Sequence, residues 1–263
     1  MTRDIPDFDA ATQVSTTGDG IYESYLTHDW SIGPVPNGGY STAAAIRALL
    51  DFTERETQLS TTAYYYRPTI ANRETTIRCA LHRAGRISTS ASAELFQDGK
   101  LRTRVSGLFG ELDNGAAQLA APAPSIAAPP ECTLRDPASQ GLNMTLMQSL
   151  EIRLEDGHPT VLENRAIVDG WVRFRDDRHP DHLGLSLFLD SFPPAVLAVR
   201  PEAGWIPTLE LTSQIRNHAA PGWIQVRVES LDIGPKRLIE DVRLWDSAGT
   251  LVAQGRQLAM VLD

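Results

Sequence analysis

The chain has 263 residues, of which 42% are hydrophobic and 22% are charged, and its formal net charge is -9. This is the composition of an ordinary globular protein, and the length allows one large domain or two domains of similar size. The acidic balance argues against nucleic acid as the main partner, because binding of a phosphate backbone needs a basic protein face.

The first clear element is a predicted helix at residues 38–51, which follows the sequence "PNGG". Its Ala- and Leu-rich sequence is typical of a helix, and Asn37 is suited to the N-cap position. Gly38 and Gly39 leave the first backbone N–H groups uncovered, and such a helix start attracts negative charge. The two glycines fit either a tight entry into the helix or a site for a carbonyl oxygen or a phosphate.

Four strand-like runs follow this helix and predict an antiparallel meander. They span residues 60–69, 74–84, 87–97 and 101–112. The pair Asp98-Gly99 between the last two runs is a strong signal for a hairpin turn. Six arginines, Arg67 among them, make this half locally basic, which suits either a solvated sheet face or contacts with an anionic small molecule.

A Pro- and Ala-rich segment at residues 114–141 separates two flanks of similar size. It shows neither a helix period nor a strand period, so we interpret it as a partly extended linker. We therefore predict two domains, at residues 18–113 and 142–263, on either side of this linker.

The second flank repeats the order of the first, after two additional predicted strands at residues 150–155 and 166–175. Its apolar segment 182–199 is predicted to be helical, with a break at Pro193-Pro194. Four predicted strands follow, at residues 208–218, 223–233, 236–246 and 251–262, with a bulge expected near Ser230. The duplication predicts an α+β fold in which each half packs a helix on an antiparallel sheet. Sheet edges that must be covered favour joined sheets and a homo-oligomer.

The ordered motifs of the two flanks resemble the acyl-CoA thioesterase II family. The motifs are "PNGGYSTAAAIRAL", "YYYRP", "RISTSASAELFQDGKL", "WIPTLELTSQIR" and "IEDVRLWDSAGTLVAQGRQLA". The resemblance extends from about Ile21 to Val261 and includes the duplication. It implies a double hotdog fold, in which two hotdog domains, each with a long helix wrapped by an antiparallel sheet, are fused. It also implies hydrolysis of an acyl-CoA thioester to a free acid and CoA, without a cofactor.

The resemblance also implies the roles of individual residues. Members of the family use an Asp, a Thr and a Gln to hold and activate a water molecule. In this sequence the three residues correspond to Asp190, Thr208 and Gln257. The expected substrate-binding residues are the helix start and two residues of "YYYRP", namely Asn37, Gly38, Gly39, Tyr66 and Arg67.

The residues alone leave alternatives open for these roles. Asp190 ends an apolar stretch, where a charge needs partners or a function, but it could also cap the turn before the prolines. Thr208, Glu210 and Thr212 alternate along one predicted strand face, so Thr212 competes with Thr208 and Glu210 could be a second carboxylate. Gln254 is the neighbour of Gln257, but its parity places it on the opposite strand face.

Two other functions compete with hydrolysis. One is a non-catalytic acyl-CoA- or lipid-binding protein, since a fold does not fix a function. The other is a hydratase or dehydratase acting on an acyl thioester, which usually needs an Asp/His pair near the helix start. The sequence has no "GxSxG" nucleophile elbow, and "GGYSTAAAIRAL" has no carboxylate, so we expect one water-based site per chain, built mainly on the second half.

The remaining sequence features concern location and metals. The N-terminus lacks the apolar core of a signal peptide, and no run of eighteen apolar residues occurs. We therefore expect a cytoplasmic protein without membrane insertion. Cys79, Cys132 and the histidines show no zinc-ligand spacing, so no metal site is expected.

Overall fold

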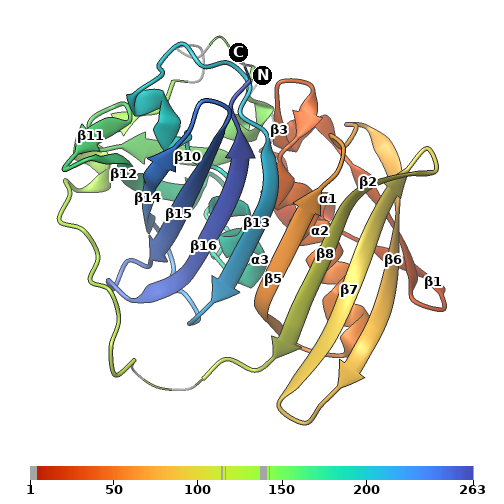
Figure 1. The fold of residues 1–263 in the computed structure, drawn as a ribbon. Helices are drawn as coiled ribbons and strands as arrows, with labels where there is room; N and C mark the ends of the chain where they lie inside the picture. Colours follow the sequence, from red (N-terminus) through yellow and green to blue (C-terminus); the bar gives the residue numbers. More distant parts are fainter. Residues whose placement is uncertain (1–4, 114, 116, 137–140, 142, 263) are drawn as a thin grey trace.

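The chain folds into two halves that lie side by side, each with antiparallel strands packed on a helix, as Figure 1 shows. The computed structural model describes residues 5–113, 115, 117–136, 141 and 143–262. The elements of the first half are α1 (Phe8–Ala11), β1 (Ser15–Gly18), β2 (Ile21–Leu26), η1 (His28–Trp30), β3 (Ser31–Ile32), β4 (Val35–Pro36), α2 (Gly38–Thr53), β5 (Thr57–Tyr65), β6 (Arg73–Ala84), β7 (Ser88–Gln97) and β8 (Lys100–Gly110). The predicted helix and four-strand meander of this half are therefore confirmed, and α1 to β4 were not predicted.

The second half has the same core elements with additional short ones before them. They are η2 (Pro129–Glu131), β9 (Thr133–Leu134), η4 (Thr145–Gln148), β10 (Leu150–Leu154), β11 (Thr160–Leu162), β12 (Arg165–Phe174), α3 (His182–Phe188), η5 (Ala195–Ala198), β13 (Thr208–Ile215), β14 (Ile224–Ile233), β15 (Arg237–Trp245) and β16 (Leu251–Met260). A register shift between Glu229 and Asp232 confirms the bulge expected near Ser230.

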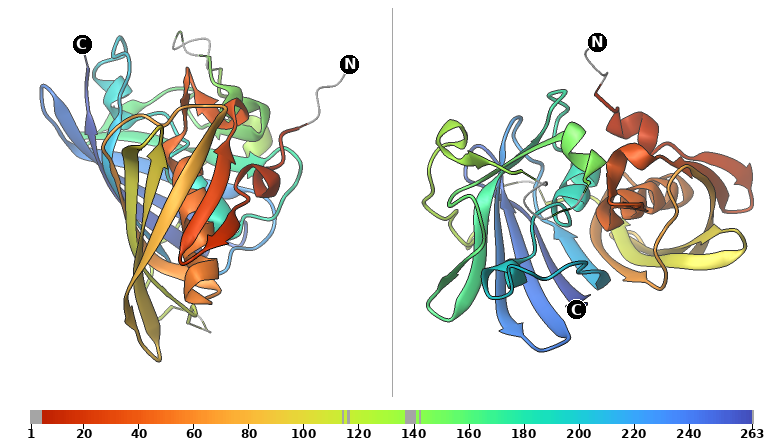
Figure 2. Two further views of the ribbon diagram at one scale, coloured as in Figure 1. Left: turned by 90° about the vertical axis from the view of Figure 1, so that its right-hand side faces the viewer. Right: turned by 90° about the horizontal axis from the view of Figure 1, so that it is seen from above.

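One continuous sheet joins the two halves. Among the described residues it has 14 strands in the order β1-β2-β6-β7-β8-β5-β13-β16-β15-β14-β12-β10-β9 with β11 beside β12, and β5 pairs antiparallel with β13 at the centre. Figure 1 shows α2 and α3 behind this sheet, and Figure 2 shows the sheet of the first half curving around its helix. The prediction that the halves join their sheets is confirmed, and the junction places the two helices against each other.

The helix of the second half is shorter than predicted. α3 ends at Phe188, and a turn through Leu189 and Asp190 precedes Pro193 and Pro194, so the segment is helical again only in the short η5. Proline has no N–H for the helical ladder and its ring clashes with the preceding turn. The early stop leaves Asp190 in a turn at the end of α3, where its side chain can face the other half.

An aromatic cluster fills the junction between the halves. The rings of Phe8 and Trp30 from the first half lie 5.1 Å apart, and Phe8 lies 5.3 Å from Phe174 of the second half. Phe174 in turn contacts Phe188 on α3 at 4.9 Å. These side chains are almost fully buried, so the interface resembles a domain core, and each half depends on the other for burial.

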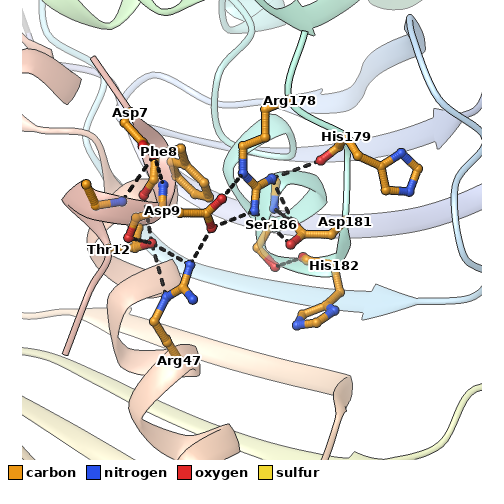
Figure 3. A network of polar contacts seen from close by, with 12 residues as sticks. Asp7, Phe8, Asp9, Thr12, Arg47, Arg178, His179, Asp181, His182 and Ser186 are labelled. Carbon is orange, nitrogen blue, oxygen red and sulfur yellow. Dashed lines mark hydrogen bonds and ion pairs between the residues drawn. The ribbon is translucent and has the colours of Figure 1, made fainter. Parts of the chain in front are cut away.

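A charged network beside this cluster fixes α1 across both helices, as Figure 3 shows. Asp9 accepts from Arg47 on α2 at 2.7 Å and from two nitrogens of Arg178 at 2.8 and 2.9 Å. Arg178 also pairs with Asp181, which caps α3 by accepting from the Gly184 N–H. The Arg178 hydrogen bonds lower the pKa of Asp9 to about 2, so this clamp persists over the neutral range.

Part of the segment predicted as a linker lies along the second half. Backbone carbonyls within residues 117–128 accept hydrogen bonds from side chains on β12, β14 and β15. Trp171 donates to Ala127 O, Gln225 to Pro124 O and Trp245 to Ala121 O. The segment also includes β9, which was not predicted, and residues 114, 116 and 137–140 of the predicted linker lie outside the described residues, as do the predicted domain ends 142 and 263.

Candidate active site

The start of α2 holds the carboxylate of Asp190. The Gly39 N–H donates to Asp190 Oδ2 at 2.8 Å. Asn37 caps α2 by accepting from the Tyr40 N–H, and its Nδ2 donates to Asp190 Oδ2 at 3.1 Å and to the Asp190 carbonyl at 2.8 Å. The predicted Asn37 cap is confirmed, and the negative charge that this helix start attracts is Asp190 itself.

The two glycines let α2 approach the end of α3 closely. A Cβ on Gly38 would lie 2.9 Å from Asp190 Oδ2, and a Cβ on Gly39 would lie 3.0 Å from the Cα of Leu187. Any larger residue would therefore push the two halves apart at the site. A carbonyl oxygen of a substrate would have to share the Gly39 N–H with Asp190, so substrate binding by Asn37, Gly38 and Gly39 stays a prediction.

Asp190 has the properties of a base poised near neutral pH. Burial raises the pKa of Asp190 from 3.8 to about 6, and the hydrogen bonds from Gly39 and Asn37 act in the opposite direction. Burial dominates because the carboxylate loses hydration that these neutral donors only partly replace. Its Oδ2 is occupied by two donors, which leaves Oδ1 toward Thr208, whose Oγ1 is 3.4 Å away.

A bulge in β13 brings Thr208 to this carboxylate. Pairing with β16 shifts between Thr208 and Glu210, so Thr208 turns to the side of Asp190, whereas Glu210 and Thr212 lie on the opposite face. The expectation that all three share one face was therefore wrong, because strict alternation does not survive a bulge. Thr212 donates to Glu210 at 2.5 Å, away from Asp190.

Gln257 completes the polar group on the same side of the sheet. Thr208 Oγ1 donates to Gln257 Oε1 at 2.8 Å. Gln254 lies with Thr212 and Glu210 on the other face, as its parity predicted. The structure thus brings together Asp190, Thr208 and Gln257, the three residues that the resemblance singled out.

Glu240 stands behind Gln257 and was missed by the sequence reasoning. It is fully buried on β15, directly opposite Gln257, and its Oε2 accepts from Gln257 Nε2 at 2.5 Å. Burial raises the pKa of Glu240 to about 7. The sequence does contain a signal for Glu240. Every second residue of this strand faces the core, and Leu238, Val242 and Leu244 are apolar, so Glu240 interrupts a row of core-facing apolar side chains.

A cavity of about 540 Å³ opens from this polar group. Its walls are mainly apolar and include Phe192, Leu197, Trp205, Ile206 and Met260. An apolar cavity with a few convergent polar groups at one side is typical of a small-molecule site.

The predicted binding residues Tyr66 and Arg67 also line this cavity. Both are exposed, and Arg67 Nη1 donates to the Leu101 carbonyl at 3.0 Å. The lining residues that were not predicted include two with polar groups at the cavity wall. They are Tyr65, which hydrogen-bonds Thr42 at 2.9 Å, and Arg135, whose Nη1 donates to the Ser191 carbonyl at 2.9 Å. Among the residues that the structure describes, no group of three His, Cys, Asp or Glu side chains is placed to hold a metal ion.

Comparison with known families decides the identity of this arrangement. Residues 26–110 match the model of the acyl-CoA thioesterase N-terminal domain, and residues 124–261 match that of the C-terminal domain. The chain belongs to the acyl-CoA thioesterase family. The resemblance noted from the motifs is therefore confirmed.

Solved structures agree with this assignment. A protein of Thermobifida fusca, provisionally assigned as a thioesterase II, is 26% identical, has a TM-score of 0.88 and matches over 99% of both chains. An Alicyclobacillus acidocaldarius protein of unknown function with a hotdog fold has a TM-score of 0.87 at 21% identity over 97% of this chain and 98% of its own. Acyl-CoA thioesterase II TesB2 of Mycobacterium marinum has a TM-score of 0.80 at 14% identity over 97% of this chain and 98% of its own. The predicted α+β double hotdog fold is thereby confirmed.

Within the described part of this thioesterase-family chain, no helix is long and apolar enough to cross a membrane.

Proposed function

We propose that this chain hydrolyses an acyl-CoA thioester with a water molecule held by Asp190, Thr208 and Gln257. The observation that carries the proposal is the position of Asp190 Oδ1, which faces Thr208 at the polar side of an apolar cavity while Oδ2 is held by Gly39 and Asn37. A carboxylate with a pKa raised to about 6 is ionised at neutral pH and still basic enough to take a proton.

The proposed reaction gives each of the three side chains a role, and Asp190 acts first as a base and then as an acid. Asp190 Oδ1 accepts a proton from the water as its oxygen attacks the thioester carbon. Thr208 and Gln257 orient that water, and the apolar cavity binds the acyl chain. The C–S bond then breaks, the CoA sulfur receives the proton from Asp190, and the products are a carboxylic acid and CoA.

The rival functions make different demands on the cavity. A hydratase or dehydratase uses a histidine beside the carboxylate, and no histidine is among the described residues that line the cavity. A pure binding protein has no need for a desolvated carboxylate, since removing a carboxylate from water lowers stability even when neutral groups donate to it. Contacts of Tyr66 and Arg67 with the CoA part, the absence of a cofactor and assembly into a homo-oligomer remain predictions.

The deciding experiment is release of free thiol from short, long, branched and aromatic acyl-CoAs. The wild type is compared with Asp190→Asn and with Asp241→Asn, whose carboxylate pairs with exposed Arg256 on the opposite sheet face. Release by the wild type and Asp241→Asn but not by Asp190→Asn supports the proposal. Tight binding of acyl-CoA without release by any variant would replace it with the binding-protein function.

A further inference from the structure

Glu240 is a buried carboxylate with both oxygens engaged by donors. Oε1 accepts from the Ala195 N–H at 2.5 Å, and Oε2 accepts from Gln257 Nε2 at 2.5 Å. The residue has 0% exposed surface and lies in a row of apolar side chains on β15. Burying a carboxyl group in such a place is unfavourable, so a fold that only needed packing would have an aliphatic residue there.

The two acceptor positions of Glu240 determine which way the amide of Gln257 points. A glutamine amide has one end that accepts and one end that only donates. While Glu240 is ionised it faces this amide with an acceptor, so the donating Nε2 end of Gln257 turns toward β15 and the accepting Oε1 end turns toward Thr208.

The orientation of Gln257 then determines where the single hydroxyl proton of Thr208 goes. Thr208 Oγ1 lies 2.8 Å from Gln257 Oε1 and 3.4 Å from Asp190 Oδ1, so the proton is donated to Gln257. Asp190 Oδ1 consequently keeps its capacity to accept a proton, and the lone pairs of Thr208 face the space beside it. A flipped amide would present Nε2 to Thr208 and direct the hydroxyl proton to Asp190, which would occupy the base.

We propose that Glu240 is a positioning residue of the active site: it fixes the amide of Gln257, and through it the hydroxyl of Thr208, so that Asp190 stays available to the water. The inference rests on the proposed roles of Thr208, Gln257 and Asp190. Glu240 itself touches neither the water nor the substrate in this scheme.

Glu240→Gln is the informative variant because it keeps the size but not the two acceptors. If its single oxygen accepts from the Ala195 N–H, its NH₂ group faces Gln257 and turns the amide around. We expect kcat to fall about tenfold or more while KM changes little, because the loss concerns water activation and not substrate binding. Glu229→Gln is the matched control, since Glu229 is buried on neighbouring β14 and pairs with Arg165 and Arg243 on the far side from Gln257.

A double-mutant cycle separates positioning from general structural damage. If Glu240 acts through Gln257, Glu240→Gln has less than about a twofold effect in a Gln257→Ala background, because the amide that it would flip is gone. An equal loss in both backgrounds overturns the inference, and so does full activity of Glu240→Gln.

The side-chain amide resonances of Gln257 in the wild type test the same point without a Glu240 variant or turnover. They are assigned by their disappearance in Gln257→Ala. A charge-assisted hydrogen bond predicts one proton shifted strongly downfield and slow to exchange. Two resonances like those of an exposed glutamine overturn the inference even if Glu240→Gln fails to fold. If the wild type hydrolyses no acyl-CoA, the proposed function fails, and this spectrum still decides the orientation of Gln257.

Discussion

Replacing Asp190 by asparagine is expected to remove turnover and to stabilise the fold at the same time. Asparagine can keep an oxygen at the position of Oδ2, where the Gly39 N–H and Asn37 Nδ2 donate. Its NH₂ group then faces the hydroxyl oxygen of Thr208, which can accept. The local hydrogen bonds survive, and only the base and its negative charge are lost.

The magnitude of both effects follows from the site. Loss of a general base lowers kcat by about 10²–10⁴-fold. The carboxylate has a pKa of 3.8 outside the fold and about 6 inside it. At about 1.36 kcal/mol per pH unit, this difference means that ionised Asp190 costs roughly 3 kcal/mol of folding free energy. Asp190→Asn should recover up to about that amount at pH 8.

The sign of the stability effect depends on pH. Because the folded state holds the Asp190 proton more tightly, the native protein loses stability as the pH rises from about 3.8 to about 6 and gains none back above that. The advantage of Asp190→Asn is therefore largest above pH 7 and shrinks as the pH is lowered toward 4.

Urea unfolding at pH 8 and pH 5, together with the thiol-release assay, measures these effects. Asp241→Asn is the control, and its free energy of unfolding and its rate should stay near those of the wild type, because a surface ion pair contributes about 0–1 kcal/mol. Asp190→Asn with wild-type turnover would refute the role of the base. A variant that is inactive but less stable at pH 8 would refute the desolvation argument.

Three further outcomes are expected. Thr208→Val should lower kcat about tenfold or more by removing the hydrogen bond to Gln257. Thr212→Val, on the other sheet face, should leave kcat within about twofold of the wild type. A larger loss for Thr212→Val than for Thr208→Val would contradict the role of Thr208. In the wild type, kcat/KM should fall with decreasing pH below about 6, as Asp190 becomes protonated; a flat profile between pH 5 and 8 would exclude it as the base. Gly39→Ala places a Cβ 3.0 Å from Leu187 Cα and should lower the melting temperature by several degrees, and an unchanged melting temperature would show that the halves can separate freely there.

The sequence predicts the repeated part of this fold well. Alternation and turn residues such as Asp98-Gly99 give the meanders of both halves, because those signals are local. The edge strand β1 has four residues, all of them exposed, so no apolar pattern marks it, and its neighbour β2 was also not predicted. The prolines predict a break in the helix, but the end of α3 as early as Phe188 also depends on how this segment meets α2, which no local pattern records.

The residue types and motifs pointed to the residues of the candidate site, but the sequence did not predict how these residues are arranged. Thr208 could be separated from Thr212 only once the bulge in β13 was seen, since a one-residue slip exchanges the two faces of a strand. The contact between Asp190 and Gly39 spans more than 150 residues, and the pairing of Glu240 with Gln257 depends on the register of β15 and β16.

The two helix starts show how the halves differ at equivalent positions. Asn37 caps α2 and Asp181 caps α3, and the ninth residue after the cap is Ile46 in one copy and Asp190 in the other. Ile46 is fully buried, and the Asp181 carboxylate is already paired with Arg178. The two halves therefore contribute different parts of one site, the first half the donors of Asn37 and Gly39 and the second half the acid, a division that two identical subunits related by symmetry cannot achieve.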